Sequence, residues 1–205
     1  MKLVVSNLTK EYNRRPVFRD ISFSLEKNDS LAITGKNGSG KSTLIKILIG
    51  VLSPTKGSVA ITVDGSVLSP ASARDQIGVV SPHLQMYEEF SAVENLQILS
   101  RIRALRRYSE EESGELLRQF KLWEKRDEHV RTYSSGMRQR LKFVFALLHK
   151  PALLLLDEPT ANLDVDGIRV VQQVVKNQKK SGILIVATNS SAEARWCRGK
   201  IHLGR

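Results

Sequence analysis

The chain has 205 residues, of which 41% are hydrophobic and 26% are charged. This composition is typical of one soluble globular domain and excludes fibrous and low-complexity proteins. Lys and Arg number 32 against 21 Asp and Glu, so the formal net charge is +11. A surplus of this size predicts an anionic partner, which can be nucleic acid, lipid headgroups or a phosphate-bearing ligand.

The apolar runs of the chain are short. The longest, 45–52 and 152–156, do not reach the roughly 18 residues that a membrane-spanning helix needs. The N-terminus carries Leu3, Val4 and Val5 before polar residues return, which is too little for a secretory signal. We therefore expect a cytoplasmic protein. Its single cysteine, Cys197, excludes an internal disulfide and an all-cysteine metal site, and we expect it to serve in packing.

Short segments rich in aliphatic and β-branched residues predict strands throughout the chain. In chain order they are Lys2–Asn7, Val17–Leu25, Leu31–Thr34, Ser58–Val63, Ile77–Val80, Leu153–Asp157 and Ile183–Ala187. Three of them, 31–34, 153–157 and 183–187, are almost wholly apolar, as strands buried on both faces are. Longer helical patterns separate these segments, so the predicted fold class is α/β.

The middle of the chain, 91–149, shows no strand signal and is predicted to be helical. Ser109 and Glu112 form a capping box at the start of one expected helix. The basic run 101–107 is followed directly by acidic residues 110–112, which predicts a solvated helix face. We expect one domain, 1–205, in which 1–90 and 150–205 form the sheet core and 91–149 form an inserted helical subdomain.

A phosphate-binding loop follows the predicted strand 31–34 and opens a helical run. Its residues are Gly35, Lys36, Asn37, Gly38, Ser39, Gly40, Lys41, Ser42 and Thr43. This strand–loop–helix context is the one that a P-loop requires. The glycines let backbone N–H groups approach phosphate oxygens, and we expect Lys41 to reach the β- and γ-phosphates and Ser42 to ligate Mg²⁺. The motif alone leaves kinases, GTPases and several classes of ATPase open.

Two adjacent carboxylates, Asp157 and Glu158, come at the end of the apolar strand 153–157. In open α/β sheets this is the edge at which loops meet ligands. We expect Asp157 to hold Mg²⁺ and Glu158 to orient or deprotonate the attacking water. Two further motifs lie on either side of this pair, 133–140, which begins a helix, and 161–164.

Together these motifs resemble the nucleotide-binding subunit of ATP-binding-cassette (ABC) transporters, in the family's order and over nearly the whole chain. The resemblance implies a P-loop core with a mixed sheet, an antiparallel β edge subdomain and an α-helical subdomain. It also implies a dimer that encloses ATP and Mg²⁺ between its subunits. Ser134 and Gly136, with Ser135 between them, would contact the ATP of the partner subunit. Asp164 would join the two sites, and Tyr12 would stack on adenine.

The chain departs from the family pattern in three places. The signature motif, usually Leu-Ser-Gly-Gly-Gln, here reads Tyr-Ser-Ser-Gly-Met over 133–137, so the glutamine contact to ribose is expected to be lost. An ungapped reading places Pro82 where the family has its coupling glutamine, and Gln85 could serve only if the loop reaches differently. Asn189 stands where the family usually has a histidine near the γ-phosphate, and it cannot carry a proton.

The resemblance implies an ATPase that drives a separate polytopic membrane subunit, as a homodimer or heterodimer attached peripherally to the inner face of the membrane. The chain is too short for a C-terminal regulatory domain, and with its signature it is similar to small exporter ATPases, including those of haem export for cytochrome c maturation. Other exporter substrates, such as a lipid, glycan or drug, remain open. The alternative is a soluble ABC-type switch acting on nucleic acid or ribosomes, and a third option is a small-molecule kinase. Nucleic acid is not the expected partner, because 205 residues hold one cassette and no coiled coil.

Overall fold

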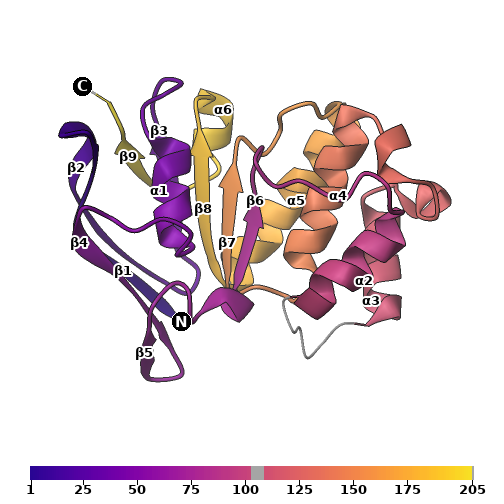
Figure 1. Ribbon diagram of the computed structural model, residues 1–205, viewed down its shortest axis with the longest axis horizontal. Coiled ribbons are helices and arrows are strands. Elements are labelled where there is room, and N and C mark those ends of the chain that lie inside the picture. The colour runs from indigo at the N-terminus through magenta and orange to yellow at the C-terminus, as the bar shows by residue number, and fades with distance from the viewer. Residues whose placement is uncertain (103–108, 205) are drawn as a thin grey trace.

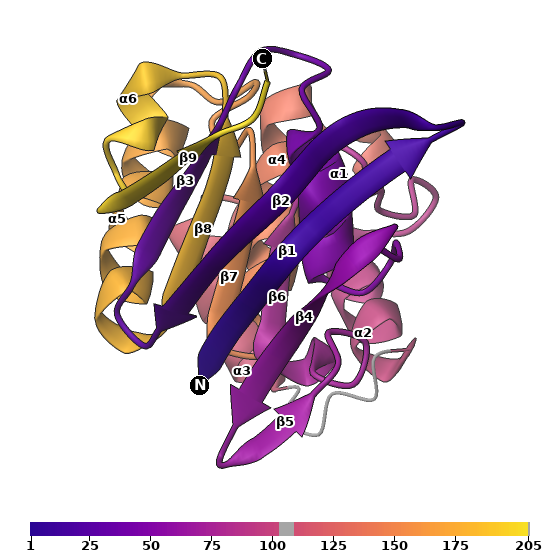
Figure 2. The same ribbon diagram turned by 90° about the vertical axis from the view of Figure 1, so that its left-hand side faces the viewer.

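The computed structural model describes residues 1–102 and 109–204. Its strands form two sheets. The first is four-stranded and antiparallel, with the order β2-β1-β4-β5. Its strands are β1 (Lys2–Tyr12), β2 (Arg15–Glu26), β4 (Lys56–Val63) and β5 (Ser66–Leu68). Figure 2 shows this sheet in front, with the long pair β1 and β2 crossing the five-stranded sheet behind it.

The second sheet is five-stranded and parallel, with the order β6-β7-β8-β3-β9. Its strands are β3 (Ser30–Thr34), β6 (Ile77–Val80), β7 (Leu153–Asp157), β8 (Ile183–Thr188) and β9 (Gly199–His202). Every residue of β3, β7 and β8 is buried, as the apolar runs predict. All five strands point the same way, so their carboxyl ends lie along one edge.

Helices cover both faces of the parallel sheet (Figure 1). They are α1 (Lys41–Leu48), α2 (Ala92–Ile102), α3 (Glu110–Gln119), α4 (Ser135–Leu147), α5 (Val165–Ser181) and α6 (Ser191–Ala194). Helix α1 lies between the two sheets, and its buried residues share a core with β1, β3 and β7. Helices α3, α4 and α5 share a second core with the other face of the sheet. Two cores, one on each side of the parallel sheet, therefore fix the edge where its strands end.

The α/β fold class is confirmed, with the antiparallel and parallel strands in separate sheets. Strand β1 continues past its expected end at Asn7. Asn7 adopts a left-handed conformation (φ 46°) and the pairing register shifts there, and this irregularity lets the strand pair again from Leu8 onward. Strands β5 and β9 were not predicted. They are short edge strands, and in β9 the exposed Lys200 and His202 flank Ile201, so no apolar run marks it.

In the helical middle of the chain, side chains cap the N-termini of two helices. The Ser109 hydroxyl caps α3 by accepting the Glu112 N–H at 3.3 Å, as predicted. Ser91 and Glu94 cap α2 reciprocally, at 2.7 and 3.2 Å. Arg103, Arg106 and Arg107 of the basic run lie outside the described residues, whereas Arg101 is exposed on α2.

Cys197 packs partly buried against the second core, and burial raises the pKa of its thiol to about 11. It is thus an inert packing residue, as expected. In the part of the chain that the structure describes, no helix combines the length and the apolar character needed to cross a bilayer.

The second core gives a stability prediction. The Phe143 ring on α4 is fully buried and stacks on Phe120 with 5.6 Å between ring centroids. Phe143→Ala should lower the free energy of unfolding by about 3–5 kcal/mol, because it removes a large apolar side chain and leaves a cavity. Urea denaturation measures the loss. The control Val51→Ala, at a side chain that is 67% exposed, should change stability by less than about 0.5 kcal/mol. Equal effects of the two variants would contradict the assigned core.

Candidate functional site

The predicted phosphate loop connects β3 to α1 at the carboxyl edge of the parallel sheet. Its tight course requires glycine at Gly40, which has φ +98°, and where a Cβ atom would come within 2.5 Å of Val17. The same is true at Gly35, where a Cβ would lie 2.2 Å from the Leu203 carbonyl oxygen. The loop therefore keeps its backbone close to β2 and to the chain after β9.

Lys41 is the first residue of α1, and its side chain is buried inside the loop. Its ammonium donates to the carbonyl oxygens of Gly35 at 2.9 Å and Lys36 at 3.3 Å. It also lies 3.6 Å from Oε1 of Glu158. A buried ammonium costs free energy unless such partners surround it, so these contacts hold the positive charge at the centre of the site.

A cleft of about 400 Å³ opens over this charge. It is lined by Val17, Asn37, Gly38, Gly40, Lys41, Ser42, Thr43, Pro82, Asp157 and Glu158. The structure thus brings together most of the predicted phosphate-loop residues and both predicted carboxylates. Such a cleft, with backbone amides and a cation at one end, can hold a phosphate-bearing ligand.

Asp157 ends β7, and only 1% of its surface is exposed. Neither of its carboxylate oxygens has a hydrogen-bond partner within the described residues. Burial raises its pKa, and the nearby Ser42 hydroxyl and Lys41 ammonium partly offset that rise. An unpartnered buried carboxylate beside a serine hydroxyl fits Mg²⁺, which prefers oxygen ligands and keeps several waters. Ser42 and Asp157 could therefore hold this metal.

Glu158 follows Asp157 in a left-handed conformation (φ 48°), which turns its side chain into the cleft. Its backbone N–H donates to the Ala187 carbonyl at 2.9 Å. Its carboxylate accepts from the Thr188 hydroxyl at 3.4 Å and from the Asn189 backbone N–H at 3.1 Å. Burial raises the pKa of Glu158, and the Glu193 and Asp157 carboxylates add to the rise while Lys41 opposes it. A raised pKa suits a general base.

Asn189 connects the end of β8 to the phosphate loop. Besides its backbone contact to Glu158, its side-chain amide donates to Oδ1 of Asn37 at 3.0 Å. The structure therefore places Asn189 between the Glu158 carboxylate and the phosphate loop, and its expected position near the γ-phosphate stays a prediction. Sequence reasoning missed Thr188, whose hydroxyl contacts Glu158, and Glu193, whose carboxylate accepts from Thr160 in the loop after β7. The signal for both was the polar run that follows a buried strand.

The signature residues lie apart from this cleft, on the exposed edge where α4 begins. The Ser134 hydroxyl caps α4 by accepting the Met137 N–H at 3.2 Å. Gly136 lies against the Asn162 carbonyl, which a Cβ atom would approach to 2.8 Å, so a side chain at Gly136 would push this loop away. Ser135 is exposed beside them.

Asp164 caps α5 by accepting the Gly167 N–H at 2.8 Å, and it forms an ion pair with Arg140 on α4. This contact ties the signature helix to the loop that follows the two carboxylates. Tyr12 lies elsewhere, as the last residue of β1 before the short turn to β2. Its ring is 51% exposed, with the Lys10 ammonium 4.9 Å from the centroid.

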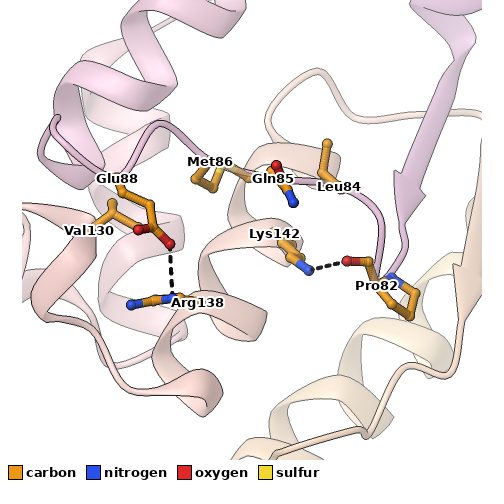
Figure 3. A pocket seen from close by; sticks show the side chains of 8 residues that line it. All are labelled: Pro82, Leu84, Gln85, Met86, Glu88, Val130, Arg138 and Lys142. Atoms are coloured by element: carbon orange, nitrogen blue, oxygen red, sulfur yellow. Dashed lines mark hydrogen bonds and ion pairs between the residues drawn. The ribbon is translucent and has the colours of Figure 1, made fainter.

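Gln85 lines a second cavity, of about 260 Å³, between the loop after β6 and helix α4 (Figure 3). Pro82 lines both cavities. The structure therefore places Pro82, and not Gln85, at the cleft that contains Glu158. The Lys142 ammonium on α4 donates to the carbonyls of Ser81 and Pro82 at 3.2 and 3.3 Å, a link between helix and loop that the sequence did not indicate.

Comparison with known proteins identifies this arrangement. The profile of the family described as ABC transporter matches residues 18–161. The linearmycin resistance ATP-binding protein LnrL of Bacillus subtilis is 32% identical over 93% of this chain, which spans 62% of the LnrL sequence. The lantibiotic transport ATP-binding protein SrtF of Streptococcus pyogenes is 32% identical over 91% of the chain and 79% of its own length.

Solved structures agree in fold. The ATP-binding subunit of an ABC transporter superposes with a TM-score of 0.86 at 31% identity, covering 99% of this chain and 86% of its own. A dimeric ATP-binding cassette bound to ADP and Pi has the same TM-score at 24% identity, covering 98% and 94%. The chain therefore belongs to the ABC transporter family, as an ATP-binding domain.

Proposed function

We propose that this chain is the ATP-binding and ATP-hydrolysing subunit of a membrane ABC exporter. The observation that carries the proposal is the cleft in which Lys41, Asp157 and Glu158 meet at the ends of β3 and β7. The names of two relatives, one for resistance to an antibiotic and one for transport of a lantibiotic, support an exporter. They favour such a cargo over haem, and a transporter over a soluble switch acting on nucleic acid.

In this proposal the phosphate loop and Lys41 bind the phosphates of ATP. The Lys41 ammonium can exchange its contacts to the Gly35 and Lys36 carbonyls for phosphate oxygens, since both are acceptors. Ser42 and Asp157 would hold Mg²⁺, which offsets charge on the β- and γ-phosphate oxygens. Glu158 accepts a proton from the attacking water, and the hydrogen bonds from Thr188 and Asn189 hold its carboxylate in place.

An exposed edge of the molecule supports the proposal that two subunits form a dimer. This edge is formed by Ser134, Ser135, Gly136 and Asp164. These residues lie outside the cleft of their own chain. We propose that they contact the ATP bound to a partner subunit, while Tyr12 stacks on the adenine of its own ATP. A polytopic membrane subunit would bind the helical subdomain, 91–149, at the second cavity beside Gln85. The protein would then sit peripherally on the inner face of the membrane.

Glu158→Gln should slow ATP hydrolysis by about 10²–10⁴-fold while leaving ATP bound, because the amide keeps the shape but cannot take a proton. Steady-state ATPase assays and light scattering with Mg·ATP measure the rate and the dimer that this variant should accumulate. The control Glu115→Gln, at an exposed residue of α3, should hydrolyse ATP like the parent. Unchanged hydrolysis in Glu158→Gln would contradict the assigned base.

The pH profile gives an independent check of the same residue. The raised pKa of Glu158 means that its base form is lost, as pH falls, at a higher pH than for an ordinary glutamate. The decline of kcat/KM, which reports the pKa of the free protein, should therefore begin at that higher pH in the parent, and this limb should be absent in Glu158→Gln.

Asn189→His should raise kcat with little change in KM, and Asn189→Ala should lower kcat. A histidine can place positive charge near the γ-phosphate as the transition state forms, whereas asparagine supplies a neutral dipole. The backbone contact from residue 189 to Glu158 remains in both variants, so only the side chain is tested. Equal kcat in Asn189→Ala and the parent would show that this side chain takes no part in hydrolysis.

A further inference from the structure

The positive charge of the chain is concentrated in its last part. Residues 167–205 include eight Lys and Arg but a single acidic residue, Glu193, and so contribute +7 of the total +11. Glu193 is 4% exposed, and its Oε1 accepts from the Thr160 backbone N–H at 3.1 Å. This acid is therefore buried and engaged, and it leaves the surface of the segment strongly positive. Within the described residues, none of these basic side chains lines the proposed ATP cleft.

Much of this charge surrounds one groove of about 350 Å³. Its lining residues come from the second half of α5 and from the segment that follows α6. Helix α5 lies on the face of the parallel sheet away from α1 (Figure 1). The residues that matter here are Lys176, Lys179, Lys180, Arg195, Trp196 and Arg198, which we call the basic groove. Among the residues that the structure describes, no acidic side chain lines it.

Within the described residues, none of the five cations of the basic groove forms an ion pair. The start of α5 differs, because there Asp166 pairs with both Lys121 and Arg169. Lys179 donates to the Trp196 carbonyl at 2.6 Å, which ties α5 to the opposite wall of the groove. The other four cations have no side-chain hydrogen bond in the part of the chain that the structure describes. Like charges held this close repel one another unless an anion joins them.

We propose that the basic groove binds a ligand with two or more phosphate groups, presented either by a soluble molecule or by a lipid headgroup. Several ammonium and guanidinium groups converging on one hollow match the charge and the acceptor oxygens of such a ligand. The volume suits a compact group, and a single tryptophan does not make the row of stacking platforms that a nucleic-acid strand uses. This proposal does not rest on ATP hydrolysis, since the groove shares no residue with the cleft.

The test compares two variants that each lose two positive charges. Lys180→Gln/Arg198→Gln removes two exposed cations of the basic groove. The control Lys27→Gln/Lys56→Gln removes two exposed cations from the β2–β3 turn and β4. With the phosphate loop saturated by Mg·ADP, binding of inorganic tripolyphosphate is measured by titration calorimetry. Flotation measures binding to phosphatidylcholine vesicles with and without an equal part of cardiolipin, whose headgroup carries two phosphates.

The groove variant should bind its probe about tenfold more weakly than the parent, because each exposed cation contributes roughly a factor of three. The control should bind like the parent, and melting temperatures and ATPase rates should be equal in all three proteins. Loss of tripolyphosphate binding alone identifies a soluble ligand, and loss of binding to the anionic vesicles alone identifies a headgroup. If the groove variant binds both probes as tightly as the control, the proposal is wrong. Groove-dependent binding of a single-stranded oligonucleotide alone would also overturn it.

Discussion

The arrangement of the rest of the site depends on the contacts of the buried Lys41 ammonium group. A desolvated positive charge is tolerated only where acceptors and a counter-charge surround it. Its acceptors come from the end of β3, and its counter-charge, Glu158, comes from the end of β7. These groups meet because β7, β8 and β3 are parallel neighbours in register, with Thr34 beside Thr188 and Asp157 beside Ala187. The two hydrophobic cores, one on each face of that sheet, hold the three strand ends in line.

This geometry explains why much of the site could be predicted from the sequence. The phosphate loop is a local pattern that follows an apolar strand, and the carboxylates of Asp157 and Glu158 end another, so the shared edge of a parallel sheet brings them together. Contacts that depend on the course of a loop could not be predicted in this way. The short loop after β6 decides that Pro82 faces the cleft and Gln85 the second cavity, and the Lys142 contacts that hold this loop come from a distant helix. Strands β5 and β9 were missed because they are short and carry no apolar run.

The net charge of +11 can be interpreted once the charged residues are located in the structure. Arg131 and Arg138 in the helical middle of the chain, and Lys150 directly after it, each pair with a glutamate. Among the described residues, Lys41 is the only Lys or Arg that lines the cleft, and the basic groove, on the face of the sheet away from α1, contains five. Residues 167–205 thus carry +7 of this charge, and none of their described Lys and Arg side chains lines the cleft. One sheet thus supports a phosphate loop at its edge and a second, separate positive surface beside α5 and α6.

Whether Lys41 holds the phosphates of ATP in this cleft can be decided by measuring ATP affinity and melting temperature together in the parent, in Lys41→Ala and in the control Lys46→Ala. Lys46 lies on the same helix but does not line the cleft. Lys41→Ala should lose tight ATP binding, because it removes the point charge that faces the β- and γ-phosphates, and should still unfold in one cooperative transition. Lys46→Ala should bind ATP like the parent. Unchanged ATP affinity in a folded Lys41→Ala variant would contradict the account.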